Sequence, residues 1–107
     1  MAQLGEEKVG CRTPAEGRDG VTNIPKWKFD LIRGHILDIL SDGQARVYND
    51  VRDEVGARLT EDEAARLGKL GWHVISVKLE MEVRGEIERV KAKGPQQIRR
   101  VETGHGA

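Results

Sequence analysis

Residues 84–100 read RGEIERVKAKGPQQIRR and contain two strand-like runs joined by a short basic turn. The runs are Ile87–Val90 and residues 97–101, and residues 91–95 between them have the Lys, Gly and Pro content of an exposed turn. Gly85 precedes the first run and can end a helix, because glycine adopts the left-handed backbone conformation without a steric penalty. The stretch therefore predicts a two-stranded ribbon that follows directly on a helix.

The segment before the ribbon, residues 72–84, fits two patterns. As a helix it has two apolar faces, formed by Val74, Val77 and Met81 on one side and by Trp72, Ile75, Leu79 and Val83 on the other. As a strand, its second half alternates apolar residues (Val77, Leu79, Met81 and Val83) with charged ones. We expect a helix, because the segment is long for a strand and ends at a glycine that precedes a second strand signal.

Residues 25–40 predict another helix. Pro25 suits its first turn because proline has no N–H group to leave unpaired, and apolar residues recur at helical spacing from there to Leu40. The Ser-Asp-Gly run at residues 41–43 is a stop signal. Gly34 lowers helix propensity, which indicates close packing at that point. A short strand is expected just before this helix, at residues 21–24.

Residues 44–71 predict one short strand and two helices. Residues 44–47 form the strand, which we expect to pair with the ribbon. The first helix begins at residue 49 or 50, and its apolar residues are Val51, Val55 and Leu59. Thr60 and Glu63 match a capping box, and the helix that they begin ends at Gly68 or Gly71.

This order of elements is typical of a winged helix-turn-helix, in which the last helix is the recognition helix and the ribbon is the wing. We expect an α+β fold of this type, with three to four helices and a small antiparallel wing sheet of two or three strands, over residues 22–101. Residues 1–21 are glycine-rich and have mixed charges and little apolar periodicity. We expect them to form a flexible N-terminal arm, and residues 102–107 to form a flexible tail.

The total charge is balanced, although the local charge is not. The 107 residues include 18 basic and 18 acidic ones, and this zero net charge counts against a dedicated nucleic-acid binder, whose domain is often strongly basic. Residues 84–101 nevertheless carry six basic residues and two acidic ones, and acidic residues gather between residues 50 and 63. The ribbon is therefore the basic part of the chain.

The sequence has no motif for catalysis, metal binding or membrane insertion. Its one cysteine, Cys11, excludes an internal disulfide and is expected to be a surface thiol, and His35, His73 and His105 lack the spacing of metal ligands. No phosphate loop, nucleophile elbow or paired-carboxylate motif is present, so we expect no enzyme activity, metal or cofactor. No apolar run approaches the length of a membrane span and no signal peptide is recognisable, which favours a cytoplasmic protein without a membrane partner.

The first functional hypothesis is DNA binding by a transcriptional regulator. Phosphate contacts from Lys and Arg supply most non-specific affinity, so the ribbon is the stronger candidate. Glu80 and Glu82 make the recognition helix a poor reader of bases, because carboxylates are repelled by phosphates. The expected nucleic-acid-binding residues are His73, Lys78, Arg89, Lys91, Lys93, Arg99 and Arg100. Lysine and glycine in an exposed turn also serve solubility and turn geometry alone.

The second hypothesis is a protein-interaction module that keeps this scaffold without reading DNA. Trp72, Ile75 and Leu79 are the candidate partner-binding residues, for a protein partner or a second copy of the chain. A helix that is apolar on two sides needs two packing surfaces, and the second could be supplied by a partner or by another part of the chain. Exposure of these three side chains would favour a partner.

The C-terminal half resembles a known family. The residues that carry the resemblance run from Gly71-Trp72, through VKLEMEVRGEIERV at residues 77–90, to QIRR at residues 97–100. They look like a family of small bacterial proteins known by a domain-of-unknown-function label, and the match extends back to the helix at residues 25–40. The run at residues 84–89 is also similar to the helix-to-wing junction of winged-helix regulators. The resemblance implies a winged-helix-like domain and no assigned activity.

Overall fold

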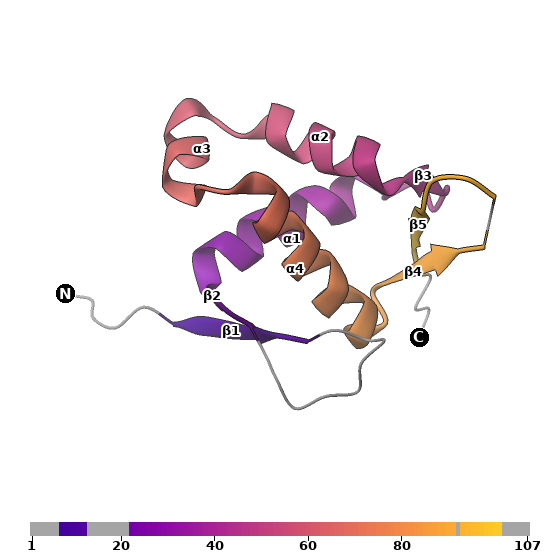
Figure 1. Ribbon diagram of the computed structural model, residues 1–107, viewed down its shortest axis with the longest axis horizontal. Coiled ribbons are helices and arrows are strands. Elements are labelled where there is room, and N and C mark those ends of the chain that lie inside the picture. Colours follow the sequence, from indigo (N-terminus) through magenta and orange to yellow (C-terminus); the bar gives the residue numbers. More distant parts are fainter. Residues whose placement is uncertain (1–6, 13–21, 92, 102–107) are drawn as a thin grey trace.

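The computed structural model describes residues 7–12, 22–91 and 93–101. In these residues the chain forms an α+β fold of four helices and two small antiparallel sheets (Figure 1). The elements are β1 (Lys8–Cys11), β2 (Thr22–Pro25), α1 (Lys26–Ile39), β3 (Arg46–Val47), α2 (Tyr48–Arg58), α3 (Glu61–Leu67), α4 (Leu70–Arg84), β4 (Ile87–Val90) and β5 (Gln97–Arg100). The expected α+β class is confirmed.

The N-terminal hairpin corrects the expected arm. Residues 8–11 form β1, which pairs with β2 so that Val9 lies opposite Ile24. The strand is held because Val9 packs against the core, Cys11 is buried, and the Lys26 amide donates to the Glu7 carbonyl at 2.8 Å. The remainder of the expected arm and the expected tail lie outside the described residues. The short strand expected before the first helix is confirmed as β2.

Helix α1 begins one residue later than predicted, because Pro25 is its N-cap and the last residue of β2, and it ends before the predicted stop signal with Leu40 as its C-cap. Its buried residues are Phe29, Ile32 and Ile36. The prediction of close packing at Gly34 is wrong, because a Cβ atom there would meet nothing within 4 Å. The close approach is at Gly56 in α2, where a Cβ atom would lie 2.7 Å from the Leu70 side chain.

Helix α3 begins where its capping box predicts, whereas α2 begins at Tyr48, before the expected start at residue 49 or 50. The Tyr48 amide at the start of α2 donates to the Gln96 carbonyl at 2.8 Å, which ties the helix to the ribbon. At the start of α3, the Thr60 hydroxyl accepts from the Glu63 amide at 3.1 Å, and the Glu63 carboxylate accepts from the Thr60 amide at 3.0 Å. The capping box is therefore confirmed, and α3 ends at Gly68.

Residues 70–84 form helix α4, so the helical alternative is correct. Gly85 ends it in the left-handed conformation with φ of 79°, and the Glu86 amide donates to the Met81 carbonyl at 2.9 Å. β4 and β5 then form the expected ribbon, and β3 pairs with β5 to give the strand order β3-β5-β4.

One apolar core joins these elements. It includes residues of the hairpin, of α1, α2, α3 and α4, and of the ribbon: Cys11, Ile24, Phe29, Ile32, Ile36, Leu40, Val51, Val55, Leu67, Val74, Val77, Met81, Ile87 and Ile98. On α4 the core residues are those of only one of its two apolar faces. The other apolar face of α4 lies outside this core and forms the candidate functional site.

Candidate interaction surface

Helix α4 packs against α1 and also contacts β1 and β4. It lies across α1, with the β1–β2 hairpin along one flank and the β4–β5 ribbon following its C-terminal end (Figure 1). Val77 and Met81 belong to the core, and both are fully buried. Because successive helical residues are 100° apart, Trp72, Ile75, Leu79 and Val83 lie on the opposite side. We call these four residues the outer face of α4.

The outer face does not belong to the core. Trp72 is 47% exposed, and Ile75, Leu79 and Val83 are partly exposed. In the described part of the chain, the partly buried apolar residues that pack against the core are Val9, Leu37, Ile39, Tyr48, Leu59 and Leu70. None of the outer-face residues is among them. The apolar face that periodicity predicted is therefore present, and within the described part of the chain it is only partly covered, with Trp72 exposed and the other three side chains partly buried.

The hairpin flank of α4 contains a buried carboxylate. Glu80 is 1% exposed and accepts from the Arg12 guanidinium at 2.7 and 3.0 Å, from the Arg12 amide at 2.9 Å and from Arg84 Nε at 2.9 Å. Burial raises the pKa of Glu80, but the hydrogen bonds from Arg12 and Arg84 outweigh it and hold this pKa at about 2. Arg84 also lies over the Phe29 ring, 4.7 Å from its centre. One carboxylate is thus shared by two arginines.

The ribbon flank repeats this arrangement. Glu82 is paired with Lys78 Nζ at 2.5 Å and with Arg89 Nε at 3.0 Å, and Lys78 also donates to the Gln96 side chain at 2.5 Å. Lys78 is 1% exposed and lies 5.4 Å from the centre of the Tyr48 ring. Burial lowers the pKa of Lys78, although Glu82 opposes the shift. Here too, two cations share one carboxylate.

These contacts correct two of the expected nucleic-acid-binding positions. Lys78 was expected to be exposed, but it is buried and held by Glu82 and Gln96 beside the ribbon. His73 was also expected to be exposed, but it is buried on the hairpin side of α4, where its Nδ1 is 2.7 Å from the Lys69 carbonyl. Neither side chain can reach a base edge without leaving its partners.

The basic residues of the ribbon divide into two groups. Arg89 is paired with Glu82, and Arg99 is paired with Glu88 at 2.5 Å across the two strands. Lys91, Lys93 and Arg100 are exposed, and within the described residues none of them has an ion-pair partner. These three are therefore the ribbon cations that the described carboxylates do not neutralise.

The hairpin residues were missed by sequence reasoning. Arg12 was assigned to a flexible arm, yet it supplies most of the hydrogen bonds to Glu80. Cys11 was expected to be a surface thiol and is 5% exposed. Burial, with the charge of Glu80, raises the pKa of Cys11 to about 11. The sequence offered only a weak signal for this contact. Glu80 is next to the apolar residue Met81, and a carboxylate that is buried beside the core needs a cation as its partner.

Comparison with known families is consistent with an uncharacterised domain. Residues 8–98 match a family model described as "Family of unknown function (DUF6958)". The chain belongs to the DUF6958 family. This match confirms the expectation of a domain-of-unknown-function family, and it includes β1, which the resemblance seen in the sequence did not cover. No curated protein and no solved structure gives a significant match.

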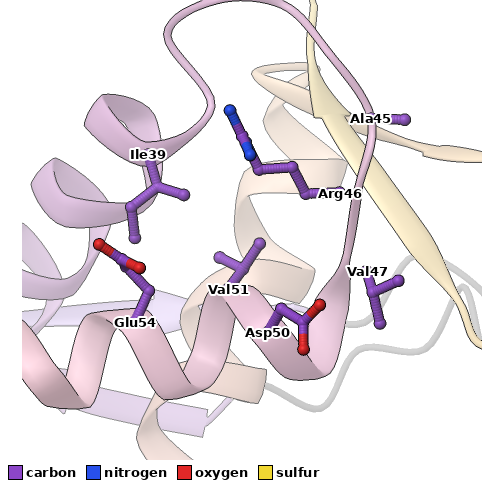
Figure 2. Close-up of a pocket in the computed structure, with 7 residues that line it drawn as sticks. All are labelled: Ile39, Ala45, Arg46, Val47, Asp50, Val51 and Glu54. Atoms are coloured by element: carbon purple, nitrogen blue, oxygen red, sulfur yellow. The ribbon is translucent and has the colours of Figure 1, made fainter.

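A cavity of about 270 Å³ in this DUF6958 chain lies between the end of α1, β3 and the start of α2. Figure 2 shows Val51 and Ile39 around it, with the Arg46 side chain reaching across and Glu54 on α2 below Ile39. Arg46 is already paired with Asp42 at 2.7 Å, and the polar lining residues are exposed. The cavity thus lacks a buried polar group that would orient a ligand.

Metal-ligating side chains do not gather in the described part of the DUF6958 chain. In residues 7–12, 22–91 and 93–101, no three His, Cys, Asp or Glu side chains come together as a metal site would require. None of the helices in these same ranges has the length and apolar content of a membrane span.

Proposed function

We propose that this chain is a protein-interaction module on a winged-helix scaffold, with the outer face of α4 as its docking surface. The scaffold is supported by the order of elements: helix α1, short strand β3, helices α2 to α4, then the β4–β5 ribbon, with strand order β3-β5-β4. A helical domain whose last helix leads into such a ribbon has the winged-helix pattern. Because one fold serves many functions, the activity is inferred from the surface and not from this pattern.

The outer face of α4 is the observation that carries the proposal. In a winged helix that reads DNA, the outward positions of the last helix carry Arg, Lys, Asn or Gln. Here they carry Trp72, Ile75, Leu79 and Val83, and the three aliphatic side chains among them cannot hydrogen-bond to base edges. Partly exposed apolar residues grouped on one helix face, with a tryptophan at its exposed end, are typical of a protein-binding site.

Peptide display tests the proposal directly. Random peptides are selected on the immobilised wild-type chain, and each enriched peptide is synthesised and titrated against purified variants. We expect the Leu79→Gln and Ile75→Gln variants to weaken binding at least tenfold, because each removes an apolar contact from the docking surface. Ala57→Gln on α2 is the matched control, since Ala57 is exposed and does not belong to the outer face of α4. Enriched peptides that bind all three variants equally would rule the proposal out.

Backbone binding of DNA is the second candidate, and a separate observation favours it. Lys91, Lys93 and Arg100 are exposed cations of the ribbon that the other described residues leave unpaired. A wing of this kind would grip phosphates without reading sequence. Arg99 and Arg89 would contribute less, because each is held by a carboxylate of the chain.

A labelled duplex at low salt tests this second candidate. If the wing binds phosphates, the Lys91→Ala/Lys93→Ala/Arg100→Ala variant lowers the slope of log K against log salt by about one for each phosphate that is no longer neutralised. Arg52→Ala on α2 is the control and should leave that slope unchanged. Failure of the wild-type chain to bind at micromolar concentration, or an unchanged slope in the triple variant, would eliminate DNA binding by the wing.

A further inference from the structure

We infer that the occupant of the outer face of α4 is an amphipathic helix of a partner protein with acidic residues along both edges of its apolar stripe. This inference rests on the proposed function and specifies the chemistry of the partner. It is based on the spacing of the outer-face residues and on the charges of the two flanks of α4.

The spacing of the outer face suits a helix. Its residues are three, four and four positions apart, from Trp72 to Ile75, to Leu79 and to Val83. An apolar stripe with this spacing presents the ridges and grooves into which the side chains of a second helix fit. An amphipathic helix that binds such a surface carries its own apolar residues three and four positions apart.

Both flanks of the stripe carry excess positive charge. On the hairpin side, Arg12 and Arg84 share Glu80, and their side chains are 51% and 38% exposed whereas Glu80 is 1% exposed. On the ribbon side, Lys78 and Arg89 share Glu82. Arg89 is the exposed member of that group, with 46% of its side chain accessible, while Glu82 is 9% exposed. Among the described residues, each flank therefore has two cations for one carboxylate and presents an arginine to solvent.

The N-terminal end of this surface adds to the same positive charge. Lys69, the N-cap of α4, is exposed and precedes Trp72 by three residues. An apolar stripe with cations on both sides is complementary to a helix with carboxylates on both sides of its own stripe.

A second copy of the chain fits this surface less well. Two α4 helices packed face to face, parallel or antiparallel, bring a positive flank of one copy against a positive flank of the other. Since both flanks are positive, neither orientation relieves the repulsion. A nucleic acid would satisfy the cations, but its phosphates would leave Ile75, Leu79 and Val83 exposed to water.

A matched pair of synthetic peptides tests the inference. Each is a capped helix of about 18 residues, long enough to be partly helical alone, with Leu and Ile at positions three and four apart. One has Glu at the flanking positions and the other has Lys. Labelled peptides are titrated with the full chain by fluorescence anisotropy at low and at moderate salt.

The acidic peptide is expected to bind at least tenfold more tightly than the basic one, with affinity that falls as salt rises. The Leu79→Gln and Ile75→Gln variants should each bind the acidic peptide at least tenfold more weakly, and circular dichroism should show that both variants are folded. The Lys69→Gln/Arg89→Gln variant should bind the acidic peptide roughly two- to fivefold more weakly for each charge removed. Arg52→Gln on α2 should leave this affinity unchanged.

Other outcomes separate this inference from the proposed function. Equal or tighter binding of the basic peptide overturns the acidic partner and leaves α4 as a docking surface. Binding of neither peptide overturns the inference, and the display selection then decides the proposed function independently. Displacement of the acidic peptide by a DNA duplex, or a dimer of the wild-type chain that Leu79→Gln dissociates, would replace the acidic helix with nucleic acid or with a second copy.

Discussion

Arg12 and Glu80 are 68 residues apart in sequence and form a two-point ion pair, with Nε and Nη2 of the arginine at 3.0 and 2.7 Å from the two carboxylate oxygens. The Arg12 amide adds a third hydrogen bond at 2.9 Å. This pair fastens the N-terminal hairpin to α4. It also sets the charge on one flank of the outer face, so it links the stability of the fold to the proposed docking surface.

Arg12→Ala is expected to destabilise the chain, because the buried Glu80 keeps Arg84 but no longer accepts two charge-assisted hydrogen bonds. Urea unfolding followed by circular dichroism measures the change. Lys26→Ala is the control: it removes an exposed i,i+4 pair with Asp30, which is worth little in water, and it should leave the urea midpoint almost unchanged. Equal effects of the two substitutions would show that the hairpin pair contributes no more than a surface pair.

Glu80 also predicts how stability depends on pH. Its pKa in the folded chain is about 2, below its ordinary value of 4.5, so the ionised form stabilises the fold. This contribution is complete above pH 4.5 and is lost as the pH falls through about 2. Urea midpoints of the wild-type chain and of Glu80→Gln, measured across this range, should therefore converge as the pH falls. A constant difference between them would contradict the role of the ionised carboxylate.

The sequence predicted those elements whose signals are local. The capping box at Thr60 and Glu63 and the left-handed glycine at Gly85 each act within a few residues, and both stand where they were expected. Periodicity likewise identified the two apolar faces of α4. These features depend on backbone geometry that neighbouring residues set.

The burial of charged residues could not be predicted in the same way. Lys78 and Glu80 have charged side chains, which ordinarily remain in water unless a partner compensates them. Their partners include Gln96 and Arg12, which are 18 and 68 residues away. Arg12 lies in a segment of low apolar periodicity. The sequence therefore places these residues on the surface, and only the folded arrangement shows that they are enclosed.

Cys11 is expected to be unreactive in the folded chain. Burial raises its pKa to about 11, so the thiolate that reacts with disulfide reagents is scarce at neutral pH. A colorimetric disulfide reagent at about pH 8 should label the native chain at least tenfold more slowly than the chain in urea. Arg12→Ala should speed the native reaction, because it loosens the strand that holds Cys11. Rapid labelling of the native wild-type chain would contradict the burial of this thiol.

Gly34→Ala is expected to stabilise the chain by about 0.5–1 kcal/mol. Gly34 is exposed inside α1, and a Cβ atom there would meet nothing within 4 Å, so the gain in helix propensity is not offset by a clash. Gly85→Ala is the contrasting variant and should destabilise, since Gly85 has φ of 79° and alanine is strained in that conformation. Thermal unfolding that shows the same sign for both variants would contradict these backbone assignments.

Substitutions on the two apolar faces of α4 should differ in how much they lower the free energy of unfolding. Met81 is fully buried, so Met81→Ala should destabilise by about 2–5 kcal/mol, from reduced burial and the cavity that remains. Leu79 belongs to the outer face, is partly exposed, and is not among the described apolar residues that pack against the core, so Leu79→Gln should destabilise much less than Met81→Ala. Urea unfolding of both variants measures the difference. A destabilisation at Leu79 comparable to that at Met81 would mean that the outer face is held by the chain itself, and it would remove the reason for assigning it to a partner.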